Sequence, residues 1–372
     1  MKPEIKTASI FGIVIIGIIA SLGIIFSSLE MSNLSSDAPQ DNKNSVSGMG
    51  VIDKSQFKKA PNLVGIADYI NTSPEELTKD IEGKVVLYDI WTYSCINCIR
   101  TLPYITAWNE KYADDGLLII GIHSPEFEFE KDPENVKMAV DKYGITYPVV
   151  LDNDMKTWKA FDNRYWPRKY IADHEGYIRY DHIGEGSYDE TEKVIQDLLK
   201  ERATQLGLNT AAAESLVKLQ EFEHTSYRTP ELYFGYKFAS GRNQLGNAEG
   251  FNPENDVKYT LPNDFKSDYF YLEGIWTNLQ GSMKLVSEDG RIILPYFAKE
   301  VNIVTSGKGE LSILLDGKPI GTEYAGSDVM EGKLLANEPG LYNIVSSDKA
   351  AAHTLTILTS SPGFEVYTFT FG

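Results

Sequence analysis

The stretch Trp91-Thr-Tyr-Ser-Cys-Ile-Asn-Cys-Ile-Arg-Thr-Leu-Pro103 holds the only two cysteines of this 372-residue chain. The apolar, β-branched run 84–90 predicts a buried strand, and apolar residues at helical spacing over 99–112 predict a helix. Cys95 and Cys98 are therefore expected where a strand ends and a helix begins. At such a place the helix dipole and unpaired backbone N–H groups favour a thiolate. The pattern predicts a redox-active dithiol.

Two other interpretations of the cysteine pair are weaker on chemical grounds. A structural zinc site needs four ligands, usually with a second Cys or His pair at short spacing. The five histidines are instead scattered along the chain, at His123, His174, His182, His224 and His353. A purely structural disulfide would close a two-residue gap and would constrain the unfolded chain very little. We therefore expect no metal and no cofactor at this site.

Segment 84–103 resembles the thioredoxin superfamily, especially its membrane-anchored TlpA/ResA type. Three further motifs are similar to the soluble redoxin part of DipZ-type proteins: Gly121-Ile-His-Ser-Pro-Glu-Phe-Glu-Phe-Glu130, Tyr165-Trp-Pro-Arg-Lys-Tyr170 and Thr229-Pro-Glu-Leu-Tyr-Phe-Gly235. The likeness runs from about residue 60 to residue 372. One departure is clear. Full DipZ-type proteins carry a multi-span electron-transfer domain, whereas this chain has a single apolar span.

The first 59 residues have the composition of a membrane anchor (1–29) followed by a flexible linker (30–59). Residues 8–29 carry no charge, and this apolar length suffices for a helix that crosses a bilayer. Lys2 and Lys6 precede the span, which predicts the N-terminus inside and the globular part outside. Ser, Asn, Asp and Gly dominate the linker. A cleaved signal peptide is the competing interpretation, but its apolar core would be shorter and would end in an Ala-x-Ala-like site.

The formal net charge of −18 limits the choice of partners. It argues against a general nucleic-acid role and against attraction to anionic lipid. We expect a soluble, self-repelling globular part outside the membrane, and acidity alone identifies no substrate.

Residues 60–206 show an alternation of strands and helices followed by an antiparallel hairpin and a terminal helix, which predicts a thioredoxin-like α/β domain. Strands are expected at 84–90, 116–123, 147–151, 169–172 and 177–180, and helices at 99–112, 135–143, 156–161 and 188–206. The segment 125–144 resembles an insertion shared by TlpA-type and peroxiredoxin-type members. Residues 207–227 are expected to connect this domain to the next.

Asp89 lies six residues before Cys95, within the strand that reads as buried. A carboxyl group there would have a raised pKa and could relay a proton to or from the second sulfur. The resemblance adds that thioredoxins have an acid in the corresponding strand. An outward-facing or hydrogen-bonded structural aspartate is the alternative, and the sequence leaves both open.

Pro167 is the expected cis-proline, because thioredoxin-like proteins have one facing the cysteine pair just before a strand. Such a loop offers backbone groups that can pair with an extended substrate. Pro148 also borders a strand, but its surroundings match an earlier strand of TlpA-type proteins, so we choose Pro167.

Two tryptophans are expected to support the substrate groove. Trp91 would pack beside the disulfide and exclude water, which is compatible with a plain core position, and Trp166 would narrow access before the proline. TlpA/ResA-type reductants often have a glutamate three residues after the second cysteine, where this chain has Thr101. That role is either vacant or filled by Asp89.

Two further features are interpreted as structural and not as functional sites. The Glu and Phe residues of 125–130 alternate as in a half-exposed extended segment. We prefer this interpretation to a metal site, because a calcium site built from carboxylates would need about six oxygens in a defined loop. His123 is expected to end a strand with ordinary hydrogen bonds.

Residues 228–372 predict an all-β sandwich, with many short strands between Gly, Asn, Asp and Pro turns. Strands are expected at 267–273, 281–286, 291–297, 301–305, 311–315, 340–345, 353–358 and 364–371. The jelly-roll form resembles carbohydrate-binding modules, which implies a glycan as a further partner. Most of the aromatic residues alternate toward the expected core, so docking of a partner or support of the redox domain is the preferred role.

Together these features predict a membrane-anchored, extracytoplasmic thiol–disulfide oxidoreductase that reduces protein disulfides. The resemblance implies a CcdA-like membrane protein as electron donor. A thiol peroxidase is the enzymatic alternative, since Thr92-Tyr-Ser-Cys95 fits a Thr-x-x-Cys pattern. A non-catalytic protein that binds glycan or protein, with the redoxin domain as scaffold, is the alternative from a different class.

Overall fold

The computed structural model describes residues 53–209, 215–223, 228–239 and 241–372, and contacts join them into one compact unit. The predicted anchor, most of the predicted linker and part of the connecting segment lie outside the described residues. Within the part of the chain that is described, no helix is long and apolar enough to cross a membrane.

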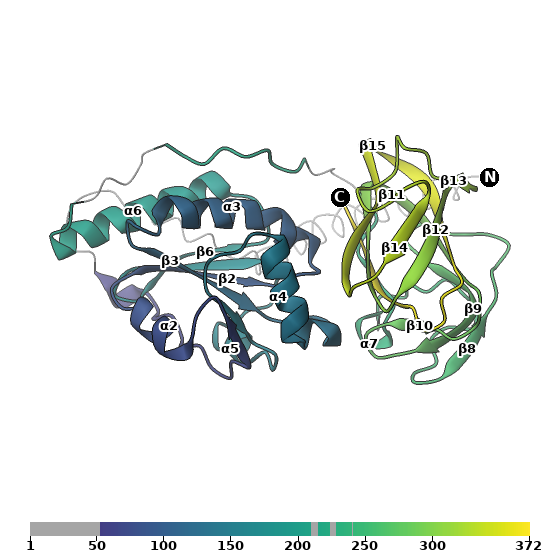
Figure 1. Cartoon of the computed structure of the whole chain (residues 1–372), viewed down its shortest axis with the longest axis horizontal. Coiled ribbons are helices and arrows are strands. Elements are labelled where there is room, and N and C mark those ends of the chain that lie inside the picture. Colours follow the sequence, from purple (N-terminus) through teal and green to yellow (C-terminus); the bar gives the residue numbers. More distant parts are fainter. Residues whose placement is uncertain (1–52, 210–214, 224–227, 240) are drawn as a thin grey trace, which may run out of the picture. The chain divides into compact units, whose positions relative to one another are not determined.

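The first domain is built on a six-stranded sheet with the strand order β1-β4-β3-β2-β5-β6 (Figure 1). Strand β2 pairs in parallel with β3, and β3 with β4, whereas β1, β5 and β6 join through antiparallel ladders. The strands are β1 (Asp68–Ile70), β2 (Val85–Trp91), β3 (Leu117–His123), β4 (Val149–Leu151), β5 (Arg168–Ala172) and β6 (Ile178–Ile183). All seven residues of β2 are buried, because helices cover both faces of the sheet.

The helices divide between the two faces of this sheet (Figure 1). Alternate residues of β2 belong to two separate hydrophobic clusters, as the two-residue period of a strand requires. Helices α3 (Ile96–Tyr112), α4 (Pro133–Lys142) and α6 (Tyr188–Leu206) contribute to the cluster around Leu87 and Trp91. Helices α2 (Pro74–Asp80) and α5 (Lys156–Ala160) border the cluster around Val86 and Ile90. Two short 3-10 helices complete the domain, η1 (Lys54–Gln56) and η2 (Glu128–Lys131).

The thioredoxin-like α/β prediction is confirmed, and the nine elements expected over 84–206 all form. Helix 188–206 has the predicted bounds, and the other eight have ends shifted by a few residues. Strand β1 and helix α2 were not predicted. Strand β1 has only three residues, and Leu77 is the only buried residue of α2, so neither carries a readable hydrophobic period.

The C-terminal region, from residue 228 onward, is a large β-sheet with one short helix, α7 (Tyr236–Ala239). The main strand order is β13-β12-β15-β11-β16-β10-β9-β8, with β14 paired to β12 and β7 paired to β16. The strands are β7 (Leu232–Tyr233), β8 (Asp256–Tyr259), β9 (Tyr271–Asn278), β10 (Met283–Leu285), β11 (Gly290–Ser306), β12 (Gly309–Leu315), β13 (Lys318–Pro319), β14 (Lys333–Ala336), β15 (Gly340–Thr359) and β16 (Glu365–Phe371).

The prediction of separate strands at 291–297 and 301–305 was wrong, as was that of separate strands at 340–345 and 353–358. Each pair is one long strand, β11 and β15, and these two strands pair along most of their length. The polar break at Lys299-Glu300 shifts the register between Ala298 and Glu300 without ending the ladder. Residues 347–350 of β15 lie opposite the single residue Lys299 of β11, so the irregularity is larger than a one-residue β-bulge.

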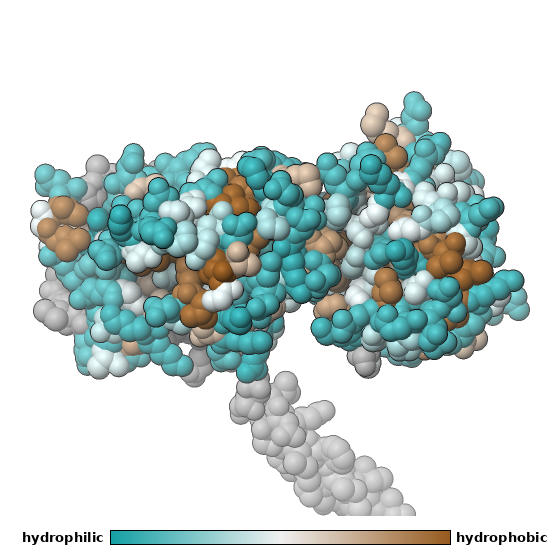
Figure 2. All heavy atoms as spheres, turned by 60° about the horizontal axis from the view of Figure 1, so that its bottom comes forward, coloured by the Kyte–Doolittle hydropathy of each residue, from teal (hydrophilic) through white to brown (hydrophobic). Residues whose placement is uncertain are grey.

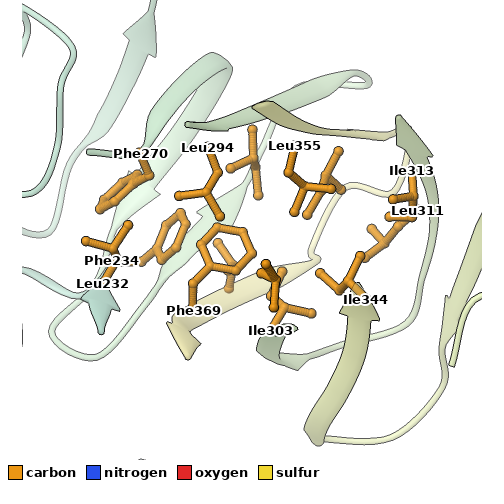
Figure 3. Close-up of a cluster of buried hydrophobic side chains, with 14 of the residues drawn as sticks. Leu232, Phe234, Phe270, Leu294, Ile303, Leu311, Ile313, Ile344, Leu355 and Phe369 are labelled. Atoms are coloured by element: carbon orange, nitrogen blue, oxygen red, sulfur yellow. The ribbon is translucent and has the colours of Figure 1, made fainter. Parts of the chain in front are cut away.

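Aromatic and aliphatic side chains fill the core of the C-terminal region. Phe234, Phe270 and Phe369 point toward one another in Figure 3, and Phe234 stacks on Phe270 with ring centroids 3.9 Å apart. Aliphatic residues such as Ile303 and Leu355 extend the same cluster. On the face shown in Figure 2, hydrophilic side chains predominate and hydrophobic ones gather in small patches.

Candidate active site

The two cysteines lie at the start of α3, just beyond the carboxyl end of β2. Cys95 is the N-cap residue, and its Sγ accepts a hydrogen bond from the backbone N–H of Cys98 at 3.2 Å. Both are free thiols; Cys95 is half-buried, whereas Cys98 is 1% exposed. Burial raises the pKa of the Cys98 thiol. Only Cys95 therefore presents its sulfur to the surface.

A buried carboxylate holds the turn that carries Cys95. Glu130, in η2, accepts a hydrogen bond from Ser94 Oγ at 2.6 Å. It also accepts the backbone N–H groups of Glu126 at 2.6 Å and Phe127 at 2.9 Å. The segment read from sequence as half-exposed thus turns Glu130 fully inward, and this residue was missed as part of the site. Its position in the quoted Glu/Phe run was the only signal.

The residues between β2 and Cys95 pack around His123. Thr92 Oγ1 lies 3.3 Å from His123 Nε2, and the Tyr93 ring stacks on the imidazole with centroids 5.6 Å apart. The Trp91 ring meets the imidazole edge-on at 5.4 Å. Burial lowers the pKa of His123 to about 3, so the ring is neutral at physiological pH. Trp91 and His123 are both fully buried, and they pack beneath the residues that lead to Cys95.

Asp89 lies in the middle of β2 and is 1% exposed. Burial raises its pKa to about 6, and the nearby Lys169 opposes that shift. The side chain is therefore buried, as one of the two interpretations of the sequence required. Its charge contributes to the raised pKa of the Cys98 thiol, so the two groups lie near each other.

Lys169 was not predicted as a site residue. It is fully buried in β5 and is the register partner of Asp89. The sequence signal was a lysine within the otherwise apolar run Lys169-Tyr-Ile-Ala172, at a position that shares a face with Ile171.

The Trp166–Pro167 peptide bond is cis, as predicted, and it immediately precedes β5. The Trp166 ring packs on Trp158 with centroids 4.2 Å apart, and its Nε1 donates to the carbonyl of Ser124 at 2.9 Å. Both contacts fix the indole at the edge of the site.

A cavity of about 420 Å³ opens beside Cys95. The first domain lines it with Ser94, Asn97 and Trp166, among others, and the C-terminal region contributes Tyr233 and Arg242. Tyr233 Oη donates a hydrogen bond to Glu126 Oε1 at 3.0 Å. The space in front of the exposed sulfur is therefore polar on several sides.

Cys95 is half-buried and caps helix α3 at the end of the central strand β2, and Cys98 lies behind it. This arrangement defines a thioredoxin-fold dithiol protein. Comparison with known proteins agrees. The family described as Redoxin matches residues 58–199, and the family described as Thioredoxin like C-terminal domain matches residues 229–372. The chain belongs to the thioredoxin superfamily, as a redoxin of the thiol–disulfide oxidoreductase class.

Individual relatives cover different parts of the chain. It is 36% identical to Protein DipZ of Mycobacterium tuberculosis over 84% of its own length, but it spans only 43% of that protein. It is 30% identical to the thiol-disulfide oxidoreductase YkuV of Bacillus subtilis, over 38% of this chain and 94% of YkuV. The thiol-disulfide oxidoreductase ResA of Bacillus thuringiensis is 28% identical over 38% of this chain and 77% of ResA.

Proposed function

We propose that this protein is a membrane-anchored, extracytoplasmic oxidoreductase that reduces protein disulfides through Cys95 and Cys98. The observation that carries the proposal is the unequal exposure of the pair. Cys95 offers its sulfur at the N-terminus of α3, where the helix dipole favours a thiolate. Cys98 is held behind it, out of reach of a large substrate.

In the proposed reaction the Cys95 thiolate attacks one sulfur of a client disulfide. The client S–S bond breaks, a mixed disulfide forms at Cys95, and the first client thiolate takes a proton from water. Cys98 then loses its proton and attacks Cys95 Sγ. The bond to the client breaks, the second client thiolate leaves and is protonated, and the Cys95–Cys98 disulfide remains. Two electrons have passed from the protein to the client.

Asp89 is the proposed acceptor of the Cys98 proton. Its burial near Cys98 supports this role, because the Cys98 thiol has a raised pKa and needs a base within the protein. With a pKa of about 6, Asp89 is ionised at neutral pH and is a stronger base than an exposed carboxylate.

Pro167 and the two tryptophans are proposed to shape the substrate groove. The backbone next to Pro167 would pair with an extended client segment, as in strand addition. Trp166 would limit the width of the groove, since Trp158 and Ser124 hold its ring in place. Trp91, which is buried, would exclude water from the two sulfurs.

The remaining proposals concern the surroundings of the dithiol. Residues 8–29 would anchor the protein, and a CcdA-like membrane protein would return electrons to Cys95–Cys98, as the resemblance to DipZ-type and TlpA-type proteins implies. The C-terminal region would take a jelly-roll form and would serve docking or support, with a glycan as the less favoured ligand.

The test uses insulin as the disulfide substrate and dithiothreitol as the reductant. Cys95→Ser should abolish catalysis, whereas Cys98→Ser should accumulate a mixed disulfide visible by non-reducing mass spectrometry. Thr78→Ala is the matched control, because it removes an exposed hydroxyl on α2 and leaves the cysteine turn intact. Full activity of Cys95→Ser would exclude the mechanism. A reduction potential of about −120 mV, as in strong oxidants, would show that the protein oxidises its clients and does not reduce them.

A further inference from the structure

The cavity in front of the exposed cysteine is rich in arginine, although the chain as a whole is strongly acidic. Three arginines line it, Arg164, Arg228 and Arg242, together with the two glutamates Glu126 and Glu231. Lysine, histidine and aspartate are absent from its lining in the described part of the chain. The whole chain has the opposite balance, with 53 acidic residues against 35 lysines and arginines. The positive charge is therefore a local property of this cavity.

The two glutamates offset only part of that charge. Burial raises the pKa of both the Glu126 and the Glu231 carboxyl groups, and Arg242 opposes the shift at each. A carboxyl group with a raised pKa carries less negative charge at neutral pH than an exposed one does. Glu126 also accepts a hydrogen bond from Tyr233 Oη at 3.0 Å. The arginines consequently dominate the electrostatic potential of the cavity, which favours an anionic ligand.

Arg242 is the arginine whose orientation is best defined. It is an exposed residue, and its guanidinium lies over the ring of Tyr233, with Cζ 4.5 Å from the ring centroid. The Tyr233 ring is itself held by the hydrogen bond to Glu126. A stacked guanidinium keeps its N–H groups available at its edge, where they can bind both oxygens of a carboxylate. Arg164 lies further out, with a side chain that is 74% exposed.

A buried hydroxyl in the wall of the cavity provides a second, independent observation. Thr370, in β16, lines the cavity and is 6% exposed. Its Oγ1 has no hydrogen-bond partner among the described residues. A buried hydroxyl without a partner lowers stability, so such groups in folded proteins call for an explanation. An oxygen of a bound carboxylate would accept this hydrogen bond.

The cavity has the size of a small-molecule site. Its volume is about 420 Å³, and small-molecule sites usually span about 300–1,000 Å³. The first domain provides one wall, with Cys95 and Trp166, and the C-terminal region provides the other, with Tyr233 and Thr370. A compact disulfide fits between these walls, whereas a protein client would have to present an extended segment.

We propose that this cavity binds small disulfides that carry carboxylate groups, and that the dithiol reduces them. The disulfides of cysteine and of glutathione share this chemistry. The inference rests on the dithiol reaction of the proposed function and extends its substrates beyond proteins. Arg242 and Thr370 are specificity residues, because they hold the carboxylate beside the reacting sulfur and take no part in making or breaking bonds.

The reaction follows the course already described for a protein disulfide. The Cys95 thiolate attacks one sulfur, the S–S bond of the small molecule breaks, and the first small thiolate leaves and takes a proton from water. Cys98 then loses its proton and attacks Cys95 Sγ, and the second small thiolate leaves and is protonated. Two electrons pass from the dithiol to the small disulfide, which becomes two thiols. The Cys95–Cys98 disulfide remains.

The experiment compares the rates at which four disulfides oxidise the reduced full chain. Glutathione disulfide and cystine carry carboxylates, bis(2-hydroxyethyl) disulfide is neutral, and cystamine is cationic. Acid quenching, alkylation and mass spectrometry measure the remaining thiols. Each rate constant is divided by that of dithiothreitol with the same disulfide, which corrects for intrinsic reactivity. The normalised rate constants for the two carboxylate disulfides should exceed the other two roughly tenfold, as expected for one hydrogen bond to a charged group.

Two variants test the assigned residues. Arg242→Gln should lower the normalised rate constants for glutathione disulfide and cystine roughly tenfold more than that for bis(2-hydroxyethyl) disulfide. Thr370→Val should lower them as well without loss of stability, because it replaces an unpaired hydroxyl by a methyl group of similar shape. A merely structural Thr370 would instead make this variant less stable. Arg291→Gln is the matched control, since Arg291 is an exposed arginine of β11 outside this cavity.

The outcomes separate this inference from the proposed function. If the reduced wild type reacts with none of the four disulfides and does not reduce insulin, the dithiol function itself is wrong. If it reduces insulin but shows no preference for carboxylate disulfides, only the inference is overturned. A preference that Arg242→Gln leaves unchanged would also overturn it. A preference for glutathione disulfide or for cystine supports the inference, and the larger normalised rate constant identifies which of the two is the better substrate.

Discussion

Asp89 is a carboxyl group that the folded chain holds away from water, at 1% exposure. Burial raises its pKa from 3.8 to about 6, against the opposing charge of Lys169. The folded state therefore binds this proton more tightly than the unfolded chain does, and ionising Asp89 lowers stability. The penalty is absent below about pH 4, grows as the pH rises toward 6, and is complete above it.

Asp89→Asn should remove this pH-dependent penalty. A shift from 3.8 to about 6 corresponds to about 3 kcal/mol, at about 1.4 kcal/mol per unit. The free energy of unfolding of the variant, minus that of the wild type, should therefore rise by about 3 kcal/mol between acidic and neutral pH. Urea titrations across this range measure it, with the exposed Asp141→Asn as control. A difference that stays constant with pH would show that Asp89 has an ordinary pKa.

At the scale of elements, η2 connects the insertion after β3 to the cysteine turn. One Glu130 oxygen binds Ser94, the residue before the nucleophile, and the other binds two backbone N–H groups of the insertion. Burial raises the pKa of Glu130, and these donors oppose that effect. The carboxylate therefore joins two segments that are 36 residues apart in sequence.

Glu130→Gln should destabilise the protein by about 3 kcal/mol. The glutamine amide is nearly isosteric with the carboxylate, but its NH2 group would face N–H and O–H donors that the carboxylate accepts in the wild type. Hydrogen bonds to charged groups are worth about 1.5–3 kcal/mol. Glu128→Gln is the matched control, since Glu128 lies on the same turn with its side chain 83% exposed. Chemical denaturation measures the free energy of unfolding of both variants. Equal losses would mean that the hydrogen bonds of Glu130 do not stabilise the fold.

Periodicity predicted most elements of the first domain because their apolar residues repeat over long runs. Helix 188–206 was predicted with the bounds that the structure has, since its buried residues recur at helical spacing. The three-residue β1 carries no such period. In the site, the cysteines and the cis-proline were readable from local sequence and resemblance. Lys169 and Glu130 were not, because their partners are set by strand register and by a turn, which no local pattern specifies.

At the scale of the whole molecule, the chain combines a redoxin domain, a large β-sheet region and an apolar N-terminal segment. Its net charge of −18 disfavours electrostatic attraction to anionic lipid. Membrane attachment would therefore depend on the hydrophobic segment alone, and not on electrostatic attraction of the surface.

This dependence makes the predicted anchor testable by charge insertion. Ile15 and Ile19 lie near the middle of the apolar run 8–29. A lysine at the centre of a membrane helix costs about 3 kcal/mol. Ile15→Lys combined with Ile19→Lys should therefore move the chain from the membrane to the soluble fraction, whereas the apolar control Ile15→Leu with Ile19→Leu should stay in the membrane. Protease added from outside should release the globular part of the wild type, and mass spectrometry should find the N-terminus intact. A mature chain beginning just after residue 29 would instead establish a cleaved signal and a secreted protein.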